Sequence, residues 1–263
     1  MRRQLTHAEE LLQSLGIEAP SDIDIEAIAW HCGVKVKEQP LDGCDAQIIG
    51  NNDKAIVTIN INQCPERKRF SIGHELGHWK YHRGRSFVCR SGDISNQGKK
   101  RSITDPELVA DNYAADLLMP EYLFQPKAQQ YKNVNFDAIR ELAECFSTSL
   151  IATAFRYVKH SFYPSMLVCH APKETRWRWF KVGAEVPEKL FLEHRLNTSS
   201  IAHKVMYSGL EQPYPESVQA DIWFNNEGAD RYYVYEQSIP IGNGCILTLL
   251  SWRNTHMLER FAA

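Results

Sequence analysis

The stretch RFSIGHELGHWKYH, residues 69–82, places His74, Glu75 and His78 in the order His-Glu-x-x-His. On a helix, side chains four residues apart lie one above the other, so both imidazoles can reach one metal ion. Glu75 is rotated by about 100° from His74 and can take a proton from a water molecule without binding the ion. The pattern predicts a hydrolytic zinc site. Two surface histidines that happen to lie four residues apart are the alternative that this motif alone leaves open.

A zinc site of this kind needs a third protein ligand. His82 continues the face of His74, but eight residues of helix place it about 12 Å along the axis, too far for one ion. Glu107 lies on the next predicted helix, residues 105–120, and Asp111 follows one turn later. Glu107 can bind the metal while Asp111 accepts the free ring N–H of a ligating histidine. Two ordinary acids at the start of a helix are the alternative.

The elements that must position these residues are helices around a small sheet. Thr6 and Glu9 form a capping-box pattern for a first helix, and a second helix is predicted over 25–32. Pro65 begins the helix of the two histidines, whose apolar residues point the other way, into a core. Alternating or β-branched segments predict three strands, the last two joined as a hairpin: 34–38, 46–50 and 55–60.

After the helix of His74 and His78, the pattern of the sequence changes twice. Residues 83–104 are polar and without periodicity, which predicts a long loop. Two short helices are expected at 136–146 and 149–159, and a break at Tyr163-Pro164 precedes a strand-rich region. The strand-like segments of that region are YPSMLVCH, RWRWFKV, SVQADIWF, RYYVYEQ and CILTLLSW.

The two motifs together resemble the ImmA/IrrE family of bacterial zinc metallopeptidases. The first motif is His-Glu-Leu-Gly-His, and the second is ELVADNYAADLLMP, residues 107–120, which fills the family's second signature position by position. The resemblance implies a gluzincin-like zinc endopeptidase, with zinc bound by His74, His78 and Glu107 and with Glu75 as general base. Many members carry an acid where this chain has Val109, so Glu107 is the one glutamate that matches.

The resemblance also implies a fold, a substrate and a role. Longer, radioresistance-type members combine three parts, which here predict an α+β chain. Its expected domains are a zincin-like helical peptidase with a small sheet (1–125), a helix-turn-helix-like segment (126–160) and a β-rich GAF-like sensory domain (161–263). Family members cleave a helix-turn-helix repressor and so switch on genes after DNA damage or phage activity.

Composition fits such a protein. The chain has 263 residues, 43% of them hydrophobic and 24% charged, with a net charge of −2, which gives no bulk attraction to nucleic acid or anionic membrane. The sequence has neither an apolar signal core nor a membrane-length apolar run. Seven cysteines are scattered singly, so a disulfide framework is not expected and a cytoplasmic location is.

Residues 132–160 look like a helix-turn-helix, but four basic residues face three acidic ones, too balanced for a strong phosphate-binding face. Packing on the peptidase core is the expected role. A DNA-binding regulator with a non-catalytic zinc site is the alternative function, and Glu75 argues against it, because a structural site needs no general base.

The segment KETRWRWFK, residues 173–181, interleaves cations with rings, as single-strand nucleic-acid binding does. The candidate contacts are Arg176, Trp177, Arg178, Trp179 and Lys181, and single-stranded DNA is the activator they predict. An ordinary strand with one buried and one solvated face explains the same alternation.

Cys89 lies in the long loop that joins the two metal-binding helices. A loop tied near the metal at both ends can bring a thiolate to the open fourth position and exclude the water that the reaction needs. Cys89 is therefore a candidate inhibitory zinc ligand, and packing as a small hydrophobe is the alternative.

Overall fold

The structure is a computed structural model that describes residues 4–83, 87–89, 105–161, 163–172, 174 and 176–262, with only the backbone described at 87–89. It is an α+β protein that divides into two compact units. One unit comprises Met1–Pro126 with Leu142–Ala152, and the other comprises Lys127–Glu141 with Thr153–Ala263. The three domains expected from the sequence remain a prediction.

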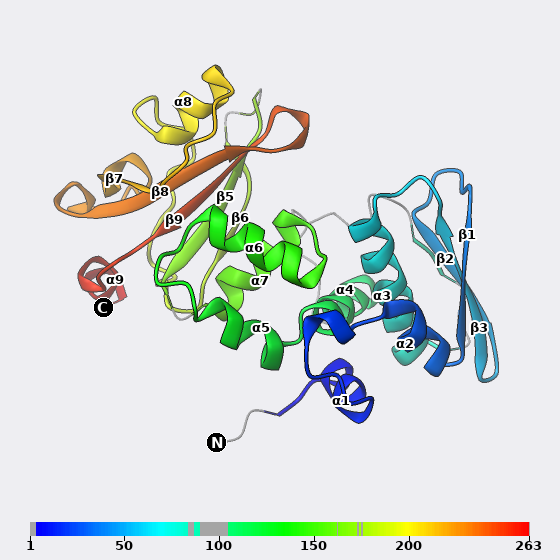
Figure 1. Ribbon diagram of the computed structural model, residues 1–263. Helices are drawn as coiled ribbons and strands as arrows, with labels where there is room; N and C mark the ends of the chain where they lie inside the picture. Colours follow the sequence, from blue (N-terminus) through cyan, green and yellow to red (C-terminus); the bar gives the residue numbers. More distant parts are fainter. Residues whose placement is uncertain are drawn as a thin grey trace. The chain divides into compact units, whose positions relative to one another are not determined.

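The first unit combines helices with one small sheet (Figure 1). Its capping box is confirmed, since the Thr6 hydroxyl accepts from the Glu9 N–H and Glu9 accepts from the Thr6 N–H. Glu9 is fully buried and also accepts from the Glu121 N–H at 2.8 Å, which ties the first helix to the start of α5. The elements are α1 (His7–Ser14), α2 (Ile25–His31), β1 (Val34–Gln39), β2 (Ala46–Asn51), β3 (Lys54–Asn60), α3 (Pro65–Tyr81), β4 (Phe87–Cys89), α4 (Pro106–Leu118) and α5 (Glu121–Ala128).

The sheet has the strand order β1-β3-β2-β4. Strands β2 and β3 form the predicted antiparallel hairpin, and Asn52 at its turn has φ 54°, a left-handed conformation that asparagine tolerates. β1 runs parallel to β3. The apolar side chains Ile72, Leu76 and Trp79 of α3 are buried in the same core as the inward side chains of the strands, as predicted.

The loop predicted over 83–104 is wrong in one part. Residues 87–89 form β4, which pairs antiparallel with β2 so that Cys89 lies opposite Ala46. A three-residue strand is too short to show a period of two, so local sequence cannot reveal it. Residues 84–86 and 90–104 and the side chain of Cys89 lie outside the described part of the chain, and its role as an inhibitory ligand remains a prediction.

Helices α3 and α4 pack at unusually short distance. A Cβ built on Gly77 would lie 2.8 Å from the Cα of Ala110, and one built on Gly73 would lie 3.2 Å from the Cβ of Ala114. Glycines on one helix therefore face alanines on the other. This contact brings the histidines of α3 beside the first turn of α4, where the Asp105 carboxylate accepts from the Glu107 N–H at 3.0 Å.

The second unit holds a sheet with the strand order β6-β5-β9-β8-β7. All five segments that the sequence marks as strand-like contribute to it, although SVQADIWF continues beyond β7 as a short 3-10 helix, Ala220–Ile222. β5 and β9 are buried along their whole length. The elements are β5 (Ser165–His170), β6 (Trp177–Val182), α8 (Ile201–Ser208), β7 (Glu216–Gln219), β8 (Tyr233–Pro240), β9 (Ile246–Ser251) and α9 (His256–Ala262).

The helices α6 (Phe136–Phe146) and α7 (Leu150–His160) follow the predicted ranges within one residue. The residues of each helix are divided between the two units. Among the described residues, no helix is both long enough and apolar enough to cross a membrane.

We expect Gly77→Ala to lower the free energy of unfolding by about 1–2 kcal/mol, because a Cβ 2.8 Å from the backbone of Ala110 puts the cost in the upper part of the overpacking range. Overpacking costs typically about 1–3 kcal/mol, against about 1 kcal/mol gained when alanine replaces a helical glycine. Urea denaturation followed by circular dichroism measures the difference. Gly242→Ala is the control, because a Cβ there meets nothing within 4 Å. A Gly77→Ala protein as stable as wild type contradicts the tight contact between α3 and α4.

Candidate metal centre

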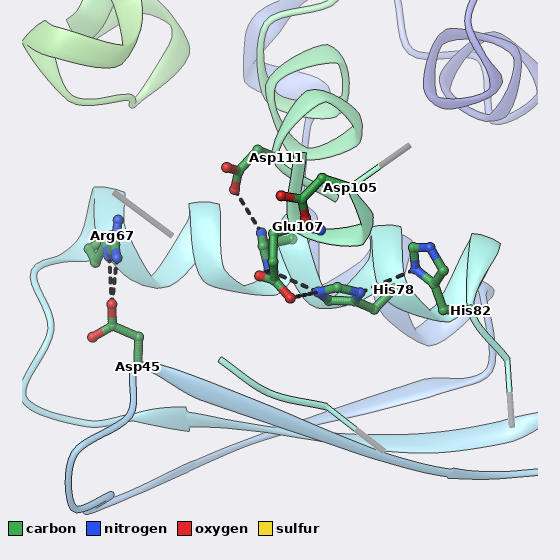
Figure 2. A network of polar contacts seen from close by, with 8 residues as sticks. Asp45, Arg67, His78, His82, Asp105, Glu107 and Asp111 are labelled. Atoms are coloured by element: carbon green, nitrogen blue, oxygen red, sulfur yellow. Dashed lines mark hydrogen bonds and ion pairs between the residues drawn. The ribbon is translucent and has the colours of Figure 1, made fainter. Parts of the chain in front are cut away.

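Three side chains from α3 and α4 converge on one point (Figure 2). The Nε2 atoms of His74 and His78 lie 3.0 Å apart, and Glu107 places its two carboxylate oxygens 3.2 Å from the first and 3.4 Å from the second. A tetrahedral zinc site with bonds of about 2.1 Å holds its ligand atoms about 3.4 Å apart. The donor set and its spacing therefore fit a zinc ion, as the sequence predicts.

Neighbouring side chains shift the pKa values of His74 and Glu107. Burial opposes a charge on His74, but hydrogen bonds from its ring to Asp111 and Glu107 outweigh burial and raise its pKa to about 9. The hydrogen bonds from His74 and His78 in turn hold the pKa of the Glu107 carboxyl well below its usual range. Without metal, a proton on His74 supplies the positive charge that the carboxylates require. Zinc must displace that proton.

The outer nitrogens of both histidines also have partners (Figure 2). Asp111 Oδ1 lies 2.9 Å from His74 Nδ1, which is the orienting contact predicted for this acid. His78 Nδ1 lies 3.2 Å from the Nδ1 of His82. His82 is absent from the metal-binding group, as expected, but it contacts a member of that group. Sequence reasoning missed this contact, although the four-residue spacing of His78 and His82 signals it.

Glu75 follows His74 in α3, one turn before His78, and its side chain is fully buried. Its charge contributes to raising the pKa of His74, so the carboxylate acts on the metal-binding group through space. A buried carboxylate beside a metal is the arrangement that general-base catalysis uses. Its catalytic role remains a prediction.

Residues 30–157 match the IrrE N-terminal-like domain of a peptidase family. This match confirms the resemblance to ImmA/IrrE proteins for the segment that carries both motifs, and it supports a metallopeptidase. The strand-rich residues after 157 lie outside the match, so a GAF-like domain there stays a prediction.

Among solved structures, a Mycobacterium tuberculosis transcriptional regulator is similar, with a TM-score of 0.59 and 14% sequence identity. The similarity covers 93% of this chain and 74% of that chain. Because the sequence identity is this low, the structural similarity shows a shared fold and nothing about function. No curated protein matches the sequence significantly.

The five candidate nucleic-acid contacts lie outside the IrrE N-terminal-like segment, at the start of β6 and along it. They do not present one face. Trp177 packs in an apolar cluster on one side of the sheet, whereas Trp179 packs on Phe155, 5.0 Å between ring centroids. Lys181 lies over the same Phe155 ring, and Arg178 lies 3.7 Å from Glu174. Arg176 is exposed.

We expect zinc affinity to rise about tenfold for each pH unit between pH 6 and 8. His74 has a raised pKa in the metal-free protein, so protons compete with zinc throughout this window, and the competition weakens as pH approaches 9. Competition with a chromogenic chelator measures the affinity. His256→Gln, which removes an exposed histidine at the start of α9, should leave the slope unchanged. An affinity that is flat from pH 6 to 8 contradicts a protonated His74.

Proposed function

We propose that this protein is a zinc-dependent endopeptidase that cleaves a helix-turn-helix transcriptional repressor and thereby derepresses stress or phage-defence genes. The observation that carries the proposal is the convergence of His74, His78 and Glu107 beside the buried Glu75, within a segment that matches the IrrE N-terminal-like domain. The chain would act in the cytoplasm, where its repressor substrate binds DNA.

Each residue of the site has a distinct task. A zinc ion held by His74, His78 and Glu107 would polarise the peptide carbonyl and acidify water. Glu75 would take a proton from the attacking water and pass it to the leaving amine. Asp111 and His82 would hold the two imidazoles in the orientation that directs Nε2 toward the ion, since each contacts an Nδ1 atom.

A DNA-binding regulator with a non-catalytic zinc site is the second candidate. It is favoured by the name of the similar solved structure, a transcriptional regulator, and by the helix pair α6 and α7. Structural zinc sites close with four protein ligands, whereas the described residues bring three together. The buried Glu75 has no task in a structural site, which makes the peptidase the better-supported function.

Activation of the peptidase by single-stranded DNA is a further part of this proposal. The cations Arg176, Arg178 and Lys181 of RWRWFK are all exposed, and Arg176 precedes Trp177 in the sequence. Cations beside rings suit stacked bases. The engagement of Arg178 and Lys181 with other side chains leaves a smaller basic surface than the sequence suggests.

The decisive variant is Glu75→Gln. It keeps the size of the side chain but removes the base, so zinc content should stay at wild-type level while cleavage falls by several orders of magnitude. The substrate is the helix-turn-helix repressor encoded beside the gene, and mass spectrometry of the products measures cleavage. Glu66→Gln, in the first turn of the same helix, is the matched control and should cleave normally.

Two outcomes count against the proposal. The assigned mechanism is contradicted if the Glu75→Gln variant cleaves the repressor at close to the wild-type rate. Wild-type protein that carries zinc, leaves the repressor intact and retards duplex DNA in a mobility shift supports the regulator instead.

A further inference from the structure

The second unit contains a cleft of about 620 Å³ beside β5 and β6. Its wall is mostly apolar and combines Met166 of β5, the rings of Trp177 and Phe180 of β6, and Leu190 and Phe191 of the segment that follows. This volume is typical of sites for small molecules, which lie at about 300–1,000 Å³. Phe191 is 58% exposed and Phe180 is 37% exposed, so two rings stand open to solvent at the cleft.

An irregularity in β6 determines which side chains line the cleft. Val168 pairs with Phe180 and Cys169 with Trp179, but His170 pairs with Trp177, so the register shifts by one residue. Strict alternation would put Arg178 on the face of Phe180. The bulge puts Trp177 there in its place. Arg178 instead directs its guanidinium to Cys245 Sγ at 3.7 Å, in the cluster on the other face of the sheet.

The bulge leaves the cleft without a lysine or arginine. Among the described residues that line it, Glu188 is the one carboxylate, and there is no lysine or arginine. Lys181, the other cation of β6, lies over the Phe155 ring at 5.8 Å and not at the cleft. A phosphate, sulfonate or carboxylate would therefore meet mostly apolar walls and one like charge, and no lysine or arginine of the lining offsets the free energy that this costs.

Trp177 contributes its indole ring to the wall. Its indole Nε1 is buried and has no hydrogen-bond acceptor among the described residues. The ring is held edge-to-face against Phe180 at 4.6 Å and nearly parallel to His194 at 6.2 Å between centroids. These ring contacts hold the indole as part of the apolar wall.

We propose that this cleft binds a small aromatic molecule that carries no negative charge. The rings of Trp177, Phe180 and Phe191 pack against its aromatic part. Glu188 excludes anions. The site lies wholly in the second unit and uses none of the metal-binding residues, so it goes beyond the proposed peptidase function and does not depend on it.

Two fluorescent probes with one ring skeleton test the site. N-phenyl-1-naphthylamine is neutral, and 8-anilino-1-naphthalenesulfonate adds a sulfonate to the same rings. With the full-length protein, the neutral probe should bind at least tenfold more tightly than the anionic one. Glu188→Lys should narrow this ratio by reversing the charge at the wall. Glu75→Gln should bind both probes as wild type does, which separates this result from the peptidase test.

Variants of exposed ring residues locate the bound probe. The double variant Phe180→Ala with Phe191→Ala should lower the affinity for the neutral probe at least tenfold. Tyr207→Ala is the control, since it removes a ring in the same unit that is 75% exposed and does not line the cleft. Equal affinity for the two probes, or an affinity unchanged in the Phe180 and Phe191 double variant while it falls in Tyr207→Ala, overturns the proposal.

Discussion

The contact between α3 and α4 is the constraint on which the candidate site depends. Two glycines of α3 lie against two alanines of α4, so the helix backbones approach closely enough for a carboxylate of one helix to meet two imidazoles of the other. A larger side chain at Gly77 would separate the helices and widen the distances among the three ligand atoms. The small sheet and the first helices serve this contact by burying the opposite side of α3 in an apolar core.

The same contact creates an electrostatic problem that a cation solves. His74, Glu75 and His78 are almost completely buried, and Glu107 and Asp111 adjoin them. Burying several ionisable groups is unfavourable unless their charges are balanced. In the metal-free protein the balance comes from a proton on His74, whose pKa of about 9 reflects two neighbouring carboxylates. A divalent ion held by His74, His78 and Glu107 would supply more positive charge at the same point.

Much of this arrangement follows from local sequence. The parts that do not follow from it have one cause in common. The capping box of α1, the Asn-Asn-Asp hairpin and the helices of both motifs depend on residues close together in the chain, so their patterns are legible. Strand β4 and the bulge at Arg178 depend on pairing with strands far away in sequence. Strict alternation would therefore place Arg178 on the face of Phe180, where the bulge places Trp177. The distance from His74 predicts that His82 does not bind the metal, but that distance does not reveal the contact of His82 with His78.

Zinc K-edge X-ray absorption on the zinc-loaded full-length protein tests the central claim most directly. If His74, His78 and Glu107 bind the zinc, its coordination shell contains two imidazole nitrogens and a carboxylate oxygen at about 2.0–2.2 Å. In Glu107→Ala the carboxylate should disappear from the shell, or the zinc should be lost on dialysis. A shell with fewer than two imidazoles, or a spectrum unchanged by Glu107→Ala at full zinc occupancy, would contradict the assignment of His74, His78 and Glu107 as the metal ligands.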